Sequence, residues 1–383
     1  MSLPRRLLPG QTHSIIRRAA RRCFFLTPTP FVNQVVLYAL GAAQLRYPKV
    51  DIHALMLESN HEHVSATDRH ASGEVSQFPE FFGYFHMLVA RALNAEYGRG
   101  ENFWKSGSYD NVENHGQQSI EAQLLYLWTN PVRDGLVESP AAWPGVHFQP
   151  EDFGRTILVR KPAGAFFGGR RAANSPTPSG LAASGSSPRE SALERQRSEL
   201  SRDEREVRDE ARAHRRSGAC AGKPKKPRAP RPPRDRSTLP QEVTVTIKPP
   251  PGYEHLNLEE VRAHFRRLLD AEVERIRDER LRAGKTRALG VEAVVTQDPL
   301  VSAGDTFPSF ARNPRVACKD RDLRVLVLLG LATFRSEYRL KREAWSRSKR
   351  VVFPPGTYGM ARLHGARVEK PSGPPRLTLG VAA

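Results

Sequence analysis

"VDIHALMLESNHEHVSATD" (residues 50–68) contains two strand-length runs joined by a short polar connection. The first run, 50–57, is mostly apolar, which favours a central strand buried on both faces. The second run carries His61 and His63, and residues two apart on a strand point to the same face. Two imidazoles aimed at one point are typical of half a metal site, whereas Glu62 points to the other face. The alternative is a purely structural role for both histidines.

Helical patterns surround these two strands. The expected elements are a strand at 12–19, helices at 31–47, 79–97 and 117–130, and a further strand near 108–113. The last helix is expected to end at Pro131, because proline removes a helical hydrogen bond. Strands and helices in this order indicate an α+β fold for residues 1–155, a ferredoxin-like split βαβ arrangement with an antiparallel sheet and helices.

The composition changes beyond residue 163. Residues 163–240 are rich in Gly, Ser, Ala and Pro and then in charged side chains. Such a segment cannot bury a core, so we expect a disordered linker or a lone charged helix. Residues 241–370 are expected to form a second, basic α/β domain of unknown role. Its expected elements are strands at 242–247 and 289–297, a helix at 258–282 capped by Asn257, and a helix at 320–345.

The charge balance indicates which class of molecule the chain binds. The chain has 60 Lys and Arg against 41 Asp and Glu, a formal net charge of +19. This excess exceeds what solubility needs and favours nucleic acid, with an anionic membrane surface as the next alternative. The three cysteines show no paired spacing, which fits a reducing cytoplasm. No apolar run is long enough to span a bilayer, so we expect a cytoplasmic, nucleoid-associated protein with no membrane partner.

Two residues of the helix expected at 117–130 strengthen the metal-site interpretation. Tyr126 and Asn130 are four positions apart and therefore share a helical face. Tyr126 has the alternative of a core position beside neighbouring leucines. Asn130 has the alternative of simply ending the helix before Pro131.

The combination of these motifs resembles the HUH single-tyrosine transposases of bacterial insertion sequences, in particular the REP-associated tyrosine transposases. The matching stretches are "RRLLPGQTHSIIRR" (5–18), "SNHEHV" (59–64), "ENFW" (101–104), "YLWTNPVRDGLV" (126–137) and "WPG" (143–145). They cover about residues 4–150. "VVFPPGTYGMARLHGAR" (351–367) is similar to the tail of longer relatives with a C-terminal extension.

The resemblance implies a DNA transposase that nicks and rejoins single-stranded DNA, with hairpin-containing element ends as its substrate. Tyr126 would be the nucleophile and would form a 5′-phosphotyrosine intermediate. His61, His63 and Asn130 would bind Mg²⁺ or Mn²⁺, and imidazole ligands suit Mn²⁺ better. The resemblance leaves open whether one chain or a homodimer completes the site.

Further side chains are candidate DNA contacts. They are Arg17, Arg18, Arg21, Arg22, Trp104, Lys105 and Arg133. An aromatic ring beside a basic side chain suits stacking on an unpaired base. The alternatives are a core position for Trp104 and a solvated basic face for the arginines.

Glu58 and Glu62 depart from the resemblance, in which these positions are apolar or aromatic. A buried carboxylate costs free energy unless it is paired. These departures suggest a catalytically decayed or domesticated nucleic-acid-binding protein. The sequence therefore leaves two function classes open, an enzyme and a binding protein.

Overall fold

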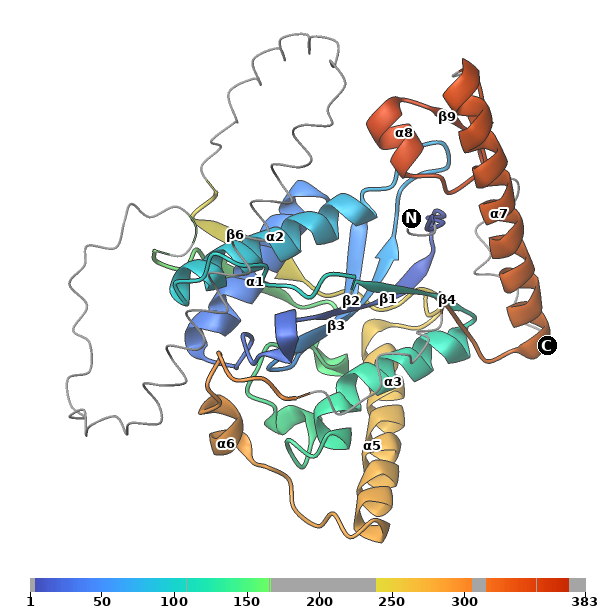
Figure 1. The fold of residues 1–383 in the computed structure, drawn as a ribbon. Helices are drawn as coiled ribbons and strands as arrows, with labels where there is room; N and C mark the ends of the chain where they lie inside the picture. Colours follow the sequence, from blue (N-terminus) through green and yellow to red (C-terminus); the bar gives the residue numbers. More distant parts are fainter. Residues whose placement is uncertain are drawn as a thin grey trace, which may run out of the picture. The chain divides into compact units, whose positions relative to one another are not determined.

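A five-stranded sheet organises the chain in the computed structural model, which describes residues 4–107, 109–164, 166, 239–304, 315–348 and 350–371. Its strands are β1 (Thr12–Arg18), β2 (Val50–Leu57), β3 (His61–Asp68), β4 (Asp110–His115) and β7 (Val316–Cys318). Their order is β2-β3-β1-β4-β7. The first four strands pair antiparallel, and β7 pairs parallel with β4 (Figure 1).

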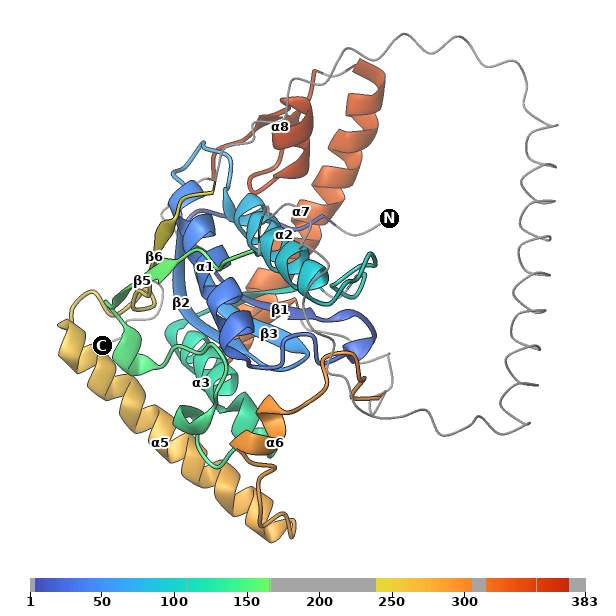
Figure 2. The same ribbon diagram turned by 90° about the vertical axis from the view of Figure 1, so that its left-hand side faces the viewer.

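This strand order is that of a ferredoxin-like split βαβ fold, as predicted. Helix α1 (Pro30–Arg46) joins β1 to β2, with β3 lying between them, and α2 (Phe78–Glu96) joins β3 to β4 around β1. Both helices cover one face of the sheet, and α3 (Gln117–Arg133) covers the other (Figures 1 and 2). The sheet therefore separates two environments, one beneath α1 and α2 and one beneath α3.

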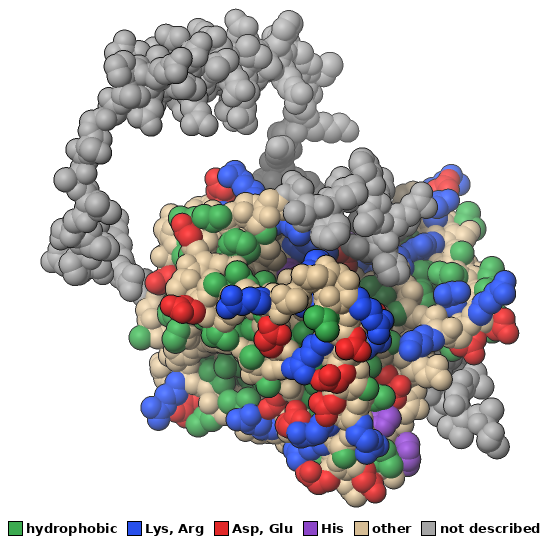
Figure 3. Space-filling view, turned by 90° about the horizontal axis from the view of Figure 1, so that it is seen from below, with side chains coloured by type: hydrophobic (Ala, Val, Ile, Leu, Met, Phe, Trp, Pro, Cys, Tyr) green, Lys and Arg blue, Asp and Glu red, His purple; other side chains and the backbone are tan. Residues whose placement is uncertain are grey.

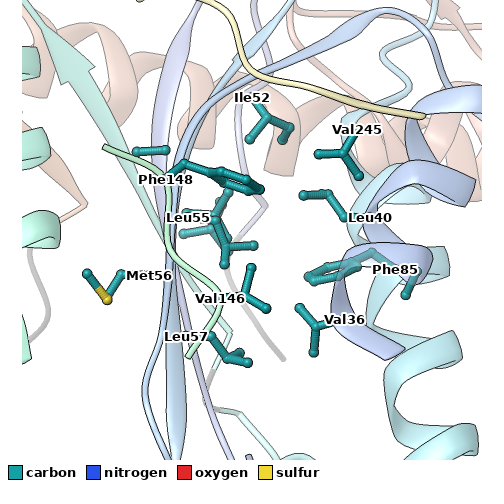
Figure 4. Close-up of a cluster of buried hydrophobic side chains, with 14 of the residues drawn as sticks. Val36, Leu40, Ile52, Leu55, Met56, Leu57, Phe85, Val146, Phe148 and Val245 are labelled. Atoms are coloured by element: carbon teal, nitrogen blue, oxygen red, sulfur yellow. The ribbon is translucent and has the colours of Figure 1, made fainter. Parts of the chain in front are cut away.

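Strand β2 is buried on both faces, yet it lies at the edge of the sheet and not at its centre. Figure 4 shows Leu55 and Leu57 on the side of α1 and α2, and Met56 on the other side. A loop covers the outer edge: Leu57 N donates to Val146 O, and Phe148 N donates to Leu55 O, both at 2.9 Å. The apolar run thus predicted burial correctly, but β3 pairs with only one edge of β2, and a loop takes the place of a second neighbouring strand.

Helix α3 continues through Pro131 to Arg133, so the predicted end at Pro131 is wrong. Proline removes only its own N–H from the hydrogen-bond ladder. Asp134 N still donates to Asn130 O at 3.0 Å and closes the last turn. Asn130 consequently lies within the helix and holds the same face as Tyr126.

Residues 241–370 do not form a domain of their own, which corrects the predicted boundary at 241. The described residues on both sides of 163–240 belong to one compact unit. Strand β6 (Glu242–Thr246) pairs with β5 (Thr156–Arg160), and β7 extends the central sheet. The physical reason is that the apolar sides of β6 and α5 pack into the main core with the first 160 residues, and β7 adds its backbone hydrogen bonds to β4, although α7 packs mainly on β7 and on the short elements after it. The predicted linker itself lies mostly outside the described residues.

Helix α5 (Leu258–Arg282) begins at Asn257, as predicted, where a capping box is complete. Its apolar side packs on α3, with the Phe265 ring 5.7 Å from that of Trp128. Its arginines are largely paired, for example Arg275 with Glu272 and Glu279. Figure 3 accordingly shows basic and acidic side chains interspersed on the face seen from below.

The remaining elements of the C-terminal part include one correction. The segment 289–297 contains a short helix, α6 (Val291–Val295), and not the predicted strand, because Val294 N donates to Gly290 O and closes a turn. The predicted last helix is present as α7 (Arg321–Ser348). The other short elements are η1 (Ala20–Arg22), η2 (Pro140–Ala142), η3 (Pro150–Asp152), β8 (Val352–Phe353), α8 (Gly359–His364) and β9 (Arg367–Val368). No described helix is long and apolar enough to cross a membrane.

Candidate active site

His61 and His63 lie side by side on β3, facing α3, with ring centroids 4.8 Å apart. His61 Nδ1 donates to Asn60 Oδ1 at 2.7 Å, so its Nε2 carries the lone pair. Burial, reinforced by Arg18 and Arg22, lowers the pKa of His61 to about 3, and burial also lowers the pKa of His63. Both imidazoles are therefore neutral at neutral pH, the form that binds metals.

Helix α3 brings the Asn130 amide to this histidine pair. Asn130 Nδ2 lies 2.6 Å from His63 Nε2 and 3.5 Å from His61 Nε2. The two ends of an amide have nearly the same shape, so a half-turn of the side chain places Oδ1 at the same point. Two imidazole nitrogens and one amide oxygen then converge.

This donor set fits a divalent metal ion. Among the described residues, no three His, Cys, Asp or Glu side chains group into a metal site, so the amide oxygen is needed as the third donor. Imidazole nitrogens suit Mn²⁺ and similar ions, whereas Mg²⁺ prefers oxygen ligands throughout. Three protein donors leave coordination positions for phosphate and water.

Tyr126 lies one helical turn before Asn130 and reaches the histidine pair from the same face. Its ring centroid is 5.7 Å from that of His63, and 43% of the residue is exposed. A core tyrosine would be buried, so the structure does not support the packing interpretation. Burial raises the pKa of Tyr126, and nearby Asp134 and Glu58 raise it further. The phenol is therefore protonated at neutral pH in the absence of a ligand.

Arg133 lies over the Tyr126 ring, with its guanidinium carbon 5.6 Å from the ring centroid. The guanidinium also pairs with Glu272, which projects from α5. Sequence reasoning identified Arg133 but missed Glu272, because this partner lies 139 positions further along the chain. Glu272 holds a cationic group next to the exposed phenol.

The Glu58 carboxylate lies 3.6 Å from His61 Nδ1 and is buried. Burial raises the pKa of Glu58 well above its usual range. The His61 Nδ1–H is donated to Asn60, so Glu58 lies beside the imidazole without a hydrogen bond to it. Glu58 therefore faces the histidine pair, on the side of the sheet opposite Glu62.

Glu62 points away from the site, as its strand position predicts. His86 Nε2 donates to the Glu62 carboxylate, and Arg17 donates to His86 Nδ1 at 2.9 Å. The carboxylate that was expected to be costly is thus paired. Arg17 therefore lies on the face of the sheet opposite the histidine pair.

The other candidate DNA contacts divide by position. Arg18 of β1 lies opposite His61 of β3 in the sheet register, and therefore on the face of the histidine pair. Its guanidinium group lies 3.7 Å from the Asp110 carboxylate. Arg21 and Lys105 are exposed around a shallow hollow next to η1. The Arg22 guanidinium donates to Gly304 O at 3.2 Å.

Trp104 is only 7% exposed, which leaves little of its ring for stacking on a base. Its indole N–H donates to His86 O at 3.0 Å, and the Arg17 guanidinium carbon lies 5.3 Å from its ring centroid. Trp104 therefore belongs to the core, the alternative that its sequence context left open.

Comparisons with known proteins give limited similarity. No family model and no curated protein matches the chain. A REP-associated tyrosine transposase bound to a REP hairpin is 18% identical, over 48% of this chain and 100% of that one, with a TM-score of 0.33. A proposed transposase from Deinococcus radiodurans R1 is 17% identical, over 34% of this chain and 97% of that one, with a TM-score of 0.24. These scores are too low for the function of either protein to be assigned to this chain. Any proposed function has to rest on the geometry of the side chains.

Proposed function

We propose that this chain cleaves and rejoins single-stranded DNA through a covalent bond to Tyr126, with Mn²⁺ or Mg²⁺ held by His61, His63 and Asn130. The Asn130 amide carries the proposal, because it lies within reach of both Nε2 atoms and one turn after an exposed tyrosine. Residues of a single chain supply all four side chains.

The reaction is an in-line transfer between two oxygen atoms. Tyr126 Oη bonds to phosphorus as the P–O3′ bond breaks, which leaves a 5′-phosphotyrosine and a free 3′-oxygen. The phenol proton passes to water, and the 3′-oxygen takes up a proton to become a hydroxyl. Attack by a 3′-hydroxyl from another end reverses the step and joins two strands without an external energy source.

Cationic groups of the chain compensate the negative charge of this reaction. The metal ion, when bound, supplies charge neutralisation at the phosphate oxygens. Arg133 stabilises the phenolate that Tyr126 must form, which matters because burial and nearby acidic groups raise the pKa of this phenol. Arg18 and Arg22 add positive charge beside His61. Hairpin-containing element ends are the proposed substrate.

The position of a label on the DNA tests this chemistry. We propose to incubate the full chain and Mn²⁺ with a pool of single-stranded oligonucleotides that contain hairpins and randomised flanks. A 3′-label should stay with the protein on a denaturing gel, because the labelled fragment carries the 5′-phosphate joined to Tyr126. A 5′-label should appear only on a shorter free fragment.

Tyr126→Phe is the matched control and should give no adduct. Cleavage without an adduct would indicate a metal-dependent phosphoesterase instead. If the wild type gives no more adduct than Tyr126→Phe, the enzyme proposal fails, and the alternative of a decayed, nucleic-acid-binding transposase relative replaces it.

A further inference from the structure

A wide groove lies between α2 and α7, on the face of the sheet opposite His61 and His63. Its volume is about 1230 Å³, larger than the roughly 300–1,000 Å³ of ordinary small-molecule pockets. Arg17 and His86 form part of its lining, and both lie on the sheet face away from the histidine pair. The groove is therefore separate from the proposed cleavage site and has room for a segment of a polymer.

The lining of the groove is strongly basic. It includes the arginines Arg5, Arg17, Arg315, Arg335, Arg339 and Arg342 and a single acidic residue, Glu343. Glu343 pairs with Arg347 at 2.6 Å, so its charge is already engaged. Guanidinium groups gathered in one groove repel one another. An anionic ligand would relieve this repulsion.

Among the described residues, five of these six arginines form no ion pair, and Arg315 lies 4.0 Å from Asp110. Arg335 and Arg339 are two of the five, and Arg335 Nε is buried without a hydrogen-bond acceptor. Arg342 donates only to the sulfur of Met360, at 3.5 Å, which is a weak acceptor. Burial, with Arg315 nearby, lowers the pKa of Arg335. The strongest donors of the groove are thus available to a ligand.

Aromatic rings accompany the arginines along the groove. Tyr109, Tyr338 and Tyr358 line it, each partly exposed. The Arg5 guanidinium carbon lies 4.5 Å from the Tyr109 ring centroid. Alternating cations and rings suit a single strand of nucleic acid, whose phosphates pair with arginine while its unpaired bases stack on aromatic faces.

We infer that the groove between α2 and α7 binds a segment of single-stranded nucleic acid, apart from the phosphodiester that would be cut at Tyr126. This binding needs neither the metal nor the cleavage step. The groove is also connected to the site through the sheet, because Arg17 contacts His86, and His86 contacts Glu62 between the two metal-site histidines.

The test measures equilibrium binding by the full chain in EDTA, where no cleavage occurs. Fluorescence anisotropy would follow labelled single-stranded DNA and, in a second arm, single-stranded RNA of the same sequence. The double variant Arg335→Ala/Arg339→Ala removes two arginines of the groove that form no ion pair among the described residues. The matched control is Arg321→Ala/Arg324→Ala, which removes two exposed arginines from the same helix, outside the groove.

We expect the groove variant to bind the oligonucleotide at least roughly tenfold more weakly than the wild type does. The slope of log K against log salt concentration should become shallower by about 1.4, which is about 0.7 for each of two lost phosphate contacts. The control should stay within about twofold of the wild type, and both should keep the wild-type circular dichroism spectrum. The DNA and RNA arms show which strand the groove prefers.

Two results would overturn the inference. One is a groove variant that binds as tightly as the control, and the other is inorganic polyphosphate competing as well as an oligonucleotide of equal charge, which would indicate a general polyanion surface. Failure of the cleavage proposal is a different observation, the absence of an adduct in Mn²⁺, and leaves the binding result unchanged.

Discussion

Glu62 and His86 form a buried pair on the opposite side of the sheet from His61 and His63. Alternation along β3 sends Glu62 towards α2, and α2 presents His86 at that point. The acidic residue that suggested a decayed copy is therefore paired with His86 in the core. It is compatible with an intact site on the other face.

Removing the Glu62 carboxylate should destabilise the fold. Glu62→Ala leaves the buried His86 Nε2–H without an acceptor, and loss of a buried hydrogen bond to a charged group costs about 1.5–3 kcal/mol of unfolding free energy. Urea denaturation of the metal-free protein measures this change. The double variant Glu62→Ala/His86→Leu should lose less than the sum of the two single variants. A single-variant loss below about 1 kcal/mol would show that the pair contributes little.

Local patterns in the sequence predicted the elements of the fold better than their partners. Alternation placed His61 and His63 on one face, and helical spacing placed Tyr126 with Asn130. The run at 291–295 gave a wrong prediction, because so short a run, with four apolar residues and Glu292, fits a strand or a helix until Gly290 closes a turn. Glu272 beside Arg133 was not predictable, since it depends on how α5 docks on α3.

The docking of α5 should make the C-terminal part unfold together with the sheet. Phe265 is fully buried, 5.7 Å from Trp128 and 5.6 Å from Phe153, ring to ring. Phe265→Ala should cost about 3–5 kcal/mol and shift one cooperative transition. Calorimetry checks this expectation. Leu281→Ala, at a 64% exposed position of the same helix, is the control and should change little. Two separate transitions, with only one shifted, would restore the two-domain interpretation.

The Asn130 amide should decide the affinity for metal. Asn130→Ala removes the third donor and should weaken Mn²⁺ binding by at least about tenfold, a loss typical even of residues that only support metal ligands. Asn130→Asp keeps an oxygen at the same place and should retain binding. Titration calorimetry with Mn²⁺ measures both variants. Equal affinities in the wild type and Asn130→Ala would remove Asn130 from the set of ligands.

Acid should weaken the fold through His53, which lies on β2 far from the proposed reaction. His53 Nδ1 donates to Lys248 O at 3.0 Å, and Nε2 accepts from Thr67 Oγ1 at 2.7 Å. The contact with Thr67 needs the neutral imidazole, since only that form has a lone pair on Nε2, and burial lowers the pKa of His53 to about 4. The unfolded chain, with an ordinary histidine pKa of about 6.5, binds a proton first as the pH falls.

His53 therefore contributes stability that is fully present above about pH 6.5 and is lost as the pH falls towards 4, by up to roughly 3 kcal/mol. Urea denaturation in EDTA at neutral pH and at about pH 5 measures this loss, which lies within the window between the two pKa values. His53→Gln cannot titrate, so its stability should depend less on pH than that of the wild type, although other buried histidines keep part of the slope. An identical slope in both proteins would show that His53 takes up its proton without loss of the fold.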